Sequence, residues 1–510
     1  MLLANVYVYL IGRAIMFEVT EWTYRVLWVV LAALVLYLFR VNQLLSRTPD
    51  EVRRLSGSRW TIDQLNKTYR QLQERPVDYT NKLPPKLERR YVVTGGSGLV
   101  GGFIVLQLLA RGNPPESIRI IDIRKTERND MSCGPATEVE FIQTDITLSD
   151  SVDAAFARPW NPSVAHLPLT VFHTAAVILA SERSKFNYSF PEAINVIGTE
   201  NVLAAARRAG ADIFSSTSSG SISVRPVEPF VLPWASSPRN FWQVLDVGDF
   251  NAPLKGREGY FANYPASKAV AERFVCSSNN ENFRTGCIRP ANGVYGHPTD
   301  NTVGDPLSRT VLPSWVSHIV QSFVHGANVS IAHLQHEAAL ARPWIESSRQ
   351  AGRPFVVTDP NPPITYGDLY NAIETLSVHP FHIIKVPPVV MLLLSHAVEI
   401  YAELPYKYPL LRKVLPELKG DIKHLKPGIF SICTHLIASN DEIRKPVSQG
   451  GLGYTGVLTT LEGMTAEILE WNKEHADDVK MRKAYTTSVS LAEQIQELWL
   501  VRGGSVSSWQ

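Results

Sequence analysis

A tyrosine and a lysine stand four residues apart in YFANYPASKAVAERF, which runs from Tyr260 to Phe274. The run is helix-like, so Tyr264 and Lys268 would share one helix face and point into one cleft. A free tyrosine loses its proton at about pH 10, and a nearby ammonium is expected to lower the pKa of Tyr264. Tyr264 could then exchange a proton with a substrate hydroxyl. Such pairs arise by chance in many helices, so the meaning of this one depends on what precedes it.

A glycine-rich turn precedes the pair, in the segment YVVTGGSGLVGGFIVLQLL at residues 91–109. An apolar strand leads into the turn and an apolar helix follows it. Glycine lets the backbone approach a pyrophosphate, and the helix N-terminus supplies free N–H groups and partial positive charge. A purely structural glycine turn is the alternative. We expect a dinucleotide to contact Gly95, Gly98, Leu99, Val100 and Gly101.

An acidic residue ends the next predicted strand, IRIIDIR. Asp122 lies 21 residues after Gly101, where a ribose-binding acid is expected. Its carboxylate would accept hydrogen bonds from a ribose diol and repel a 2′-phosphate, which favours NAD. Arg124 lies two residues further on and could reverse that choice, so NADP stays an alternative.

The elements that position these residues follow a repeating pattern from Tyr91 onward. Short apolar runs alternate with longer helical stretches, which predicts parallel strands joined by right-handed crossovers. We therefore expect an α/β fold with a doubly wound, Rossmann-type sheet. The predicted NAD-binding domain covers residues 88–290. After it the alternation weakens and prolines become frequent, so residues 291–472 are interpreted as a smaller substrate-binding lobe and residues 473–510 as a C-terminal helix and tail.

The N-terminal part is different in kind. Residues 26–39, VLWVVLAALVLYLF, carry no charge and are bracketed by Arg25 and Arg40. Fourteen helical residues span about 21 Å, less than the ~30 Å of a hydrocarbon core, so a buried soluble helix is an alternative. Flanking arginines and aromatic residues favour a membrane anchor at residues 1–46. A polar linker with one possible helix, at residues 62–73, follows at 47–87.

The charge around the anchor predicts its orientation. Arg40, Arg47, Arg53 and Arg54 follow the apolar run, whereas only Arg13 and Arg25 precede it among the basic residues. By the positive-inside rule the rest of the chain lies in the cytosol. We expect a single-pass membrane protein in contact with lipid.

Overall composition excludes some function classes. The 510 residues include 50 basic and 48 acidic ones, a formal charge of +2, so no basic excess exists to grip nucleic acid. The four cysteines have no metal-ligand spacing, and no metal site is predicted. They are interpreted as buried thiols of a reducing compartment.

The spacing TGxxGxxG together with YxxxK resembles the extended short-chain dehydrogenase/reductases, from about residue 91 to 472. The resemblance implies that Ser219, Tyr264 and Lys268 are catalytic. Ser219 would hydrogen-bond the reacting oxygen and Lys268 would hold the nicotinamide ribose. Neighbouring Ser218 and Ser221 remain alternatives to Ser219. The further cofactor contacts that the resemblance implies are Asp145 and Ile146 in TDI, Thr174 and Ala175 in HTAA, and Pro290 in IRPANGVYG.

Three later segments resemble the 3β-hydroxysteroid dehydrogenase branch, which includes sterol-4α-carboxylate 3-dehydrogenases. They begin at residues 352, 384 and 451. The segment from 384 is interpreted as core packing or as an interfacial helix. The resemblance implies NAD(P)-dependent oxidation of a 3β-hydroxyl on a sterol or triterpenoid, with decarboxylation of a 4-carboxysterol, in the endoplasmic reticulum membrane. Candidates for binding the carboxylate are Arg225, Arg239, Arg289 and His297.

Two departures from that branch keep other functions open. Ser219 and Tyr264 are 45 residues apart, which is long for the family, and HLQH at residues 333–336 has histidine where asparagine is usual. A 3β-hydroxysteroid or ketone oxidoreductase of secondary metabolism fits this divergence. A non-catalytic, membrane-tethered dinucleotide-binding scaffold and a nucleotide-sugar epimerase are further alternatives. The sequence leaves the oligomeric state and the reaction direction open.

Overall fold

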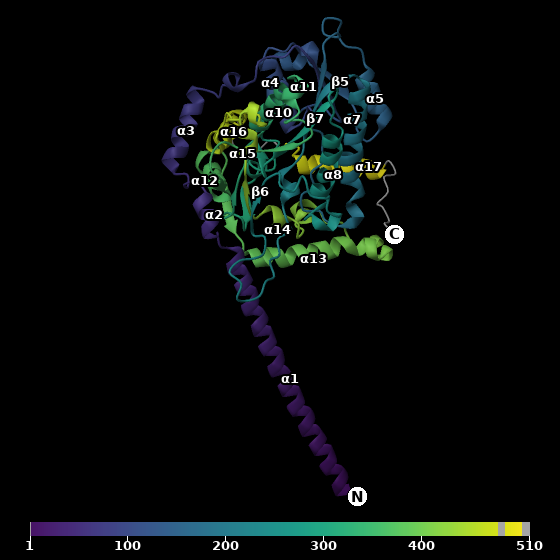
Figure 1. Cartoon of the computed structure of the whole chain (residues 1–510). Helices are drawn as coiled ribbons and strands as arrows, with labels where there is room; N and C mark the ends of the chain where they lie inside the picture. Colours follow the sequence, from purple (N-terminus) through teal and green to yellow (C-terminus); the bar gives the residue numbers. More distant parts are fainter. Residues whose placement is uncertain (1, 478–484, 502–510) are drawn as a thin grey trace.

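The computed structural model describes residues 2–477 and 485–501, and the predicted tail beyond residue 501 lies outside this range. A single helix, α1 (Leu2–Leu45), projects from the body (Figure 1). Its 44 residues correspond to about 66 Å. The apolar side chains of residues 26–36 are exposed, whereas Val41, Leu44 and Leu45 are buried in the body. The helix ends where the predicted anchor does.

Seven parallel strands form the central sheet, in the order β12-β7-β5-β4-β1-β2-β3. Apolar, β-branched residues fill the inner strands on both faces, as expected of a parallel sheet covered on both sides. In register, Val93 of β1 lies opposite Ile120 of β2 and Phe172 of β4. The strands are β1 (Arg90–Thr94), β2 (Ile118–Asp122), β3 (Glu140–Gln143), β4 (Leu169–His173), β5 (Ala211–Thr217), β7 (Arg284–Pro290) and β12 (Pro354–Val357).

Helices cover both faces of this sheet. Successive residues of β1 point to opposite faces: Val93 packs with Ile104 and Leu108 of α4, while Val92 packs with the opposite helical layer. The predicted doubly wound Rossmann-type fold is confirmed. One layer contains α4 (Leu99–Ala110) and α10 (Gly326–Leu340), and the other contains α5 (Ser149–Ala157), α7 (Gly198–Arg208) and α8 (Asn263–Ser277).

The edge strand β12 belongs to the sheet but lies beyond the predicted domain limit at residue 290. It pairs in parallel with β7, with Phe355 opposite Ile288. The connection between these strands carries α10 and part of the small lobe, so the strand–helix alternation is interrupted in the sequence. Residues 291–472 therefore supply a strand and a helix to the sheet layers as well as forming the lobe.

The small lobe is built around a four-stranded sheet, in the order β13-β10-β15-β6. Helix α3 (Ile62–Glu74) packs here, although it lies in the predicted linker, close to the helix expected at residues 62–73. Arg59 is held by an ion pair of 2.7 Å to Asp368. The strands are β6 (Trp242–Leu245), β10 (Val320–Gln321), β13 (Ile364–Thr365) and β15 (His435–Ala438); the flanking helices are α12 (Tyr366–Leu376) and α16 (Thr460–Glu474).

Two long helices complete the body. Helix α13 (Pro388–Lys407) lies across the side of the body from which α1 leaves, and α17 (Ser488–Val501) lies near the sheet (Figure 1). By length and composition alone, residues 21–55 and α13 are apolar enough to cross a membrane. Shorter elements are α2 (Asp50–Leu55), α6 (Ser189–Glu192), α9 (Gly304–Leu307), α11 (Trp344–Ser347), α14 (Ile429–Ile432), α15 (Asp441–Arg444), β8 (Val294–Tyr295), β9 (Val311–Ser314), β11 (Val324–His325) and β14 (His382–Lys385).

The packing of β12 can be tested by removing its central side chain. Phe355 is fully buried, so Phe355→Ala is expected to lower the free energy of unfolding by about 3–5 kcal/mol. Urea unfolding followed by circular dichroism measures the change. Ile345→Ala is the control, because Ile345 is 85% exposed. Equal stabilities of the two variants would mean that β12 is not a packed strand of the sheet.

Candidate functional site

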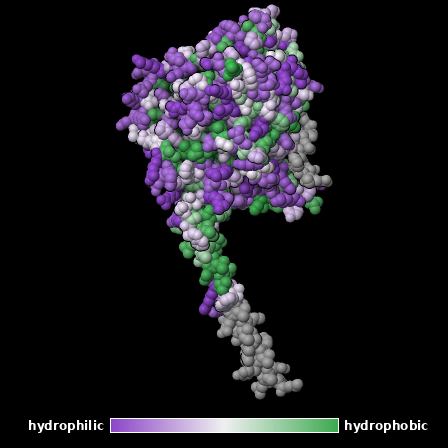
Figure 2. Space-filling model, viewed as in Figure 1, coloured by the Kyte–Doolittle hydropathy of each residue, from purple (hydrophilic) through white to green (hydrophobic). Residues whose placement is uncertain are grey.

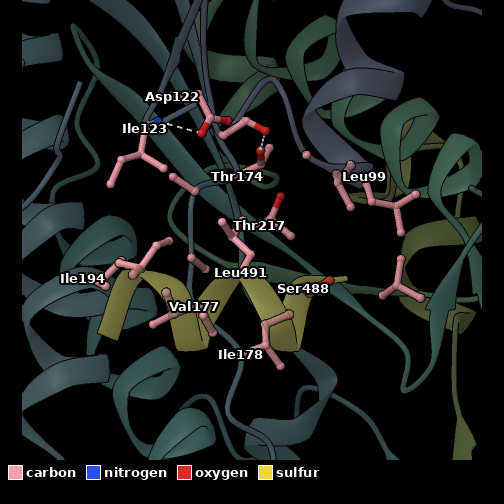
Figure 3. Close-up of a pocket in the computed structure, with 18 of the residues that line it drawn as sticks. Leu99, Asp122, Ile123, Thr174, Val177, Ile178, Ile194, Thr217, Ser488 and Leu491 are labelled. Atoms are coloured by element: carbon pink, nitrogen blue, oxygen red, sulfur yellow. Dashed lines mark hydrogen bonds between the residues drawn. The ribbon is translucent and has the colours of Figure 1, made fainter. Parts of the chain in front are cut away.

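A cavity of about 740 Å³ lies at the carboxyl ends of β1, β2, β4 and β5 (Figure 3). Parallel strands direct their carboxyl ends to one edge of a sheet, so residues that follow different strands meet there. Thirteen of the fourteen predicted site residues line it, and Gly101 packs behind them. The lining includes Gly95, Gly98, Leu99, Val100, Asp122, Asp145, Ile146, Thr174, Ala175, Ser219, Tyr264, Lys268 and Pro290.

The glycine turn has the backbone geometry that lets a dinucleotide approach the start of α4. Gly95 has φ +70°, which favours glycine, and Gly98 is the N-cap of α4. A Cβ atom on Gly101 would lie 2.3 Å from the Gly95 carbonyl oxygen, so only glycine lets the helix approach the turn this closely. Because Gly98 has no side chain to cap α4, the first N–H groups of the helix are available to a pyrophosphate.

Asp122 lies at the end of β2, facing this turn. Its Oδ2 accepts a hydrogen bond of 3.0 Å from the Ser97 N–H, and its Oδ1 accepts one of 2.7 Å from the Ile123 N–H (Figure 3). Burial raises the pKa of Asp122, and these backbone donors oppose the rise. Arg124 donates to Glu127 Oε1 at 2.6 Å, so a carboxylate already pairs with its guanidinium.

The loops after β3 and β4 close the cavity around the turn. Asp145 Oδ1 accepts hydrogen bonds from Thr147, at 3.0 Å from N and 2.7 Å from Oγ1, which fixes the loop after β3. Thr174 Oγ1 donates to the Thr94 carbonyl at 2.8 Å, which ties the loop after β4 to β1. The backbone of Ala175 packs directly on Gly95. These contacts fix both loops beside the glycine turn.

The three predicted catalytic residues come from two elements and meet in the cavity. Tyr264 and Lys268 lie one turn apart on α8, which begins at Asn263 rather than at Tyr260. Ser219 follows β5, and its side chain hydrogen-bonds Tyr264. Lys268 Nζ donates to the Thr217 carbonyl at 2.6 Å. The end of β5 and the start of α8 are thus held together by polar contacts.

The hydrogen bonds distinguish Ser219 from its neighbours. Ser218 Oγ donates to Glu272 Oε2 at 2.5 Å, within a buried ion pair between Glu272 and Arg289. Ser221 is buried, and its Oγ lies 2.8 Å from Ser219 Oγ. Ser219 is therefore the serine whose hydroxyl contacts Tyr264.

The pKa of Tyr264 differs from the expectation. Burial raises it to about 12, and the hydrogen bond with Ser219 opposes the rise only in part. Burial also lowers the pKa of Lys268 to about 8, opposed by Cys287 and Glu272. The expected lowering of the Tyr264 pKa is wrong because Tyr264 is buried and the Lys268 ammonium is directed at the Thr217 carbonyl. At neutral pH Tyr264 keeps its proton.

The candidates for carboxylate recognition are not part of this cavity. Within residues 2–477 and 485–501, its lining contains none of the four. Arg289 is buried and pairs with Glu272 and Asp249, so that proposed role is wrong. The other three are Arg225, which contacts Gln243, Arg239, which pairs with Glu228, and His297, which lies 4.0 Å from Glu470.

The unusual HLQH segment supports the strand that carries Thr217. His333 and His336 lie on α10 and are both buried. The Nδ1 atoms of both rings lie within 2.9 Å of Ser215 Oγ, and His333 Nε2 lies 2.8 Å from Thr217 Oγ1. Burial lowers the pKa of both histidines, so they are neutral supports rather than cations.

Helix α17 contributes a wall that the sequence analysis missed. It runs along one side of the cavity, where Figure 3 labels Ser488 and Leu491. Trp499 contacts Phe190 with ring centroids 5.8 Å apart, and Glu493 pairs with Lys423 at 2.9 Å. Apolar residues at helical spacing in SLAEQIQELWL could have indicated a packed face. The lining residues are Ser488, Leu491, Ala492, Ile495, Leu498 and Trp499.

Comparison with known proteins identifies the family. Residues 92–231 and 242–386, more than half of the chain, match the 3-beta hydroxysteroid dehydrogenase/isomerase family. A Mycobacterium tuberculosis protein, 3 beta-hydroxysteroid dehydrogenase/Delta 5-->4-isomerase, is 31% identical over 48% of this chain and 60% of its own length. An Arabidopsis thaliana protein, 3beta-hydroxysteroid-dehydrogenase/decarboxylase isoform 2, is 25% identical over 75% of this chain and 62% of its own length. The chain thus spans about three fifths of the length of each of these two relatives.

Solved structures give weaker matches. The epimerase Mth375 from Methanothermobacter thermautotrophicus has a TM-score of 0.49 and 15% identity, over 79% of this chain and 97% of its own. A Thermus thermophilus UDP-glucose 4-epimerase in complex with NAD has a TM-score of 0.46 and 17% identity, over 74% of this chain and 97% of its own. The family match and the sheet described above do not depend on them. The chain belongs to the 3-beta hydroxysteroid dehydrogenase/isomerase family.

Proposed function

We propose that this protein oxidises the 3β-hydroxyl group of a sterol or triterpenoid, with NAD as the cofactor. The observation that carries the proposal is the convergence of Ser219, Tyr264 and Lys268 in a cavity that the glycine turn and Asp122 also line. A non-catalytic scaffold would have no need for this convergence. The family match supports the 3β-hydroxysteroid class over a nucleotide-sugar epimerase.

The side chains divide the reaction between them. NAD, when bound, supplies the hydride acceptor. Ser219 Oγ donates a hydrogen bond to the reacting oxygen of the substrate. Tyr264 exchanges the proton of the 3β-hydroxyl with that oxygen. Lys268 keeps a positive charge beside the site and is positioned by Thr217. Because Tyr264 is protonated at neutral pH, its phenol can donate directly in ketone reduction, whereas in sterol oxidation it must first release its own proton to solvent before it accepts the one from the 3β-hydroxyl.

We extend the proposal to a 4-carboxysterol that is decarboxylated. Oxidation at C3 turns such a substrate into a β-keto acid, which can lose carbon dioxide without a further protein group. The printed name of the Arabidopsis relative, a dehydrogenase/decarboxylase, supports this extension. The 45-residue separation of Ser219 and Tyr264 favours the alternative, a 3β-hydroxysteroid or ketone oxidoreductase of secondary metabolism.

We also propose a location in the endoplasmic reticulum membrane, with α1 as a single-pass anchor and the body in the cytosol. The exposed apolar residues of α1 and the excess of arginines after its apolar run support this topology. An apolar substrate dissolved in the bilayer fits the same location.

Tyr264→Phe removes the hydroxyl that exchanges the proton. Turnover is expected to fall on the order of 10²–10⁴-fold, while NAD affinity stays within a few-fold of the wild type. NADH formation and NAD fluorescence titration measure the two quantities. Tyr69→Phe is the matched control, because its hydroxyl contacts Asn472, away from the cavity lining. Retained turnover in Tyr264→Phe would overturn the assigned role.

A substrate panel separates the proposed reactions. Membranes containing the protein and NAD are incubated with 3β-hydroxysterols that carry or lack a C4 carboxyl group. Both products, NADH and carbon dioxide, are expected from the acids. NADH alone would refute decarboxylation, and the absence of turnover on every sterol would refute the substrate class.

Asp122→Asn tests the choice of NAD. The variant keeps an acceptor for the Ser97 N–H but removes the charge that repels a 2′-phosphate. We expect the affinity for NADP to rise and the affinity for NAD to fall, each about tenfold. The preference for NAD over NADP would therefore decrease. Calorimetric titration with both dinucleotides checks this, with Asp150→Asn on the exposed surface as the control. An unchanged preference would show that Asp122 does not select the cofactor.

A further inference from the structure

Helix α17 begins beside the loop that follows β2. Glu127 of that loop accepts two hydrogen bonds from Thr486, at 3.3 Å from N to Oε2 and at 3.1 Å from Oγ1 to Oε1. Thr487 Oγ1 accepts from the Ser490 N–H at 3.3 Å and so caps the helix. A carboxylate beside the first turn of a helix is also favoured by the helix dipole. Glu127 therefore fixes the start of what we call the clamp, which is Thr486 together with α17.

Two further contacts hold the clamp along one side of the cofactor cavity. Glu493 pairs with Lys423 of the small lobe at 2.9 Å. The ring of Trp499 contacts Phe190 of α6, with centroids 5.8 Å apart. The clamp thus connects three separate parts of the body. It lies outside the family match, which ends at residue 386.

The clamp lies against the wall that we expect to meet the adenosine half of NAD. Ala492 is buried in the hydrophobic cluster that also contains Ile146, Val177 and Ile194. Figure 3 shows α17 beside Ile194 and Val177. Ile146 is the proposed adenine contact, so an adenine bound there would lie next to the clamp.

Part of the apolar surface of the clamp is left uncovered. The surface of the body in Figure 2 is mostly hydrophilic, and apolar residues gather on α1 and along the underside of the body. Leu498 lines the cavity and is nevertheless 55% exposed. Covering an apolar side chain with a ligand is favourable because it removes that surface from water. Leu498 therefore offers contact area to a bound dinucleotide.

The start of the clamp also acts on the cation beside the proposed ribose contact. The Arg124 N–H lies 3.5 Å from Asp122 Oδ1, and both residues line the cavity. The Arg124 guanidinium donates to Glu127 Oε1 at 2.6 Å, and this is the carboxylate that Thr486 holds. A 2′-phosphate is bound best by a guanidinium that is free to form charge-assisted hydrogen bonds. Glu127 occupies Arg124 and removes that possibility.

We propose that the clamp holds the adenosine half of bound NAD and, through Glu127, disfavours NADP. Thr486 keeps Glu127 in place, and Glu127 keeps Arg124 from pairing with a 2′-phosphate. This selection is additional to that by Asp122, because it depends on a segment more than 350 residues further along the chain. The inference rests on the dinucleotide site of the proposed function and not on its sterol substrate.

The contact with NAD is tested with Leu498→Ala in the full chain. The truncation removes apolar contact with the dinucleotide, so NADH is expected to dissociate at least about threefold faster. Stopped-flow fluorescence measures the rate while excess NAD displaces bound NADH. Leu500→Ala is the matched control, because Leu500 lies on the same helix, is 44% exposed and does not line the cavity. Equal rates in the two variants would refute the contact.

The selection is tested by calorimetry with two adenosine probes, 5′-AMP and adenosine 2′,5′-bisphosphate. Glu127→Gln removes the charge but keeps an oxygen that accepts from Thr486. We expect the affinity for the bisphosphate to rise about tenfold and the affinity for AMP to change by less than about twofold. Adding Arg124→Gln should remove most of this gain, and Glu138→Gln on the exposed surface is the control. No gain in Glu127→Gln, or an equal gain without Arg124, would refute the role of Glu127.

The link between the clamp and the selection is tested with Thr486→Val, which deletes the hydroxyl that bonds Glu127. The affinity for the bisphosphate is expected to rise about threefold, less than in Glu127→Gln because the Thr486 N–H bond remains. An unchanged affinity would refute the link. Inactivity of the wild type on every sterol would instead refute the proposed function and leave these results standing, because none of them requires turnover.

Discussion

The parallel pairing of β1 with both β2 and β4 is the constraint on which the site depends. From β1 the chain adds β2 and β3 on one side and β4, β5 and β7 on the other, so the direction of winding changes at β1. The loops separate at such a point and leave a crevice at the carboxyl ends of the strands. The glycine turn, Asp122, Thr174 and Ser219 all follow strands that end there.

Burial then sets the chemistry of the crevice. Burial raises the pKa of Tyr264, so Tyr264 keeps its proton, and it lowers the pKa of both Lys268 and His333, so His333 is neutral. The hydrogen bonds of Lys268 to the Thr217 carbonyl and of Tyr264 to Ser219 hold the reacting groups in fixed positions. The end of β5 makes the polar contacts to all three groups, through Ser215, Thr217 and Ser219. Substitutions there are therefore expected to disturb both the geometry and the protonation of the site.

Local patterns were sufficient to predict much of the fold and the cofactor side of the site. The strand, glycine turn and helix from residue 91 to 109 are contiguous, and Asp122 ends the next strand. Contacts between distant segments could not be predicted. Strand β12 and helix α17 reach the core from far along the chain, and the pairing of Arg289 with Glu272 depends on how α8 packs on β7.

The pKa of Tyr264 was predicted in the wrong direction for a related reason. Helical spacing showed that Lys268 would be near, but burial and the Thr217 carbonyl are properties of the packed structure. The central claim is hydride transfer from C3 of a 3β-hydroxysterol. The most direct measurement uses a sterol deuterated at the 3α position and follows the label by mass spectrometry. One deuterium in the NADH formed is predicted, and unlabelled NADH from an oxidised sterol would contradict the account.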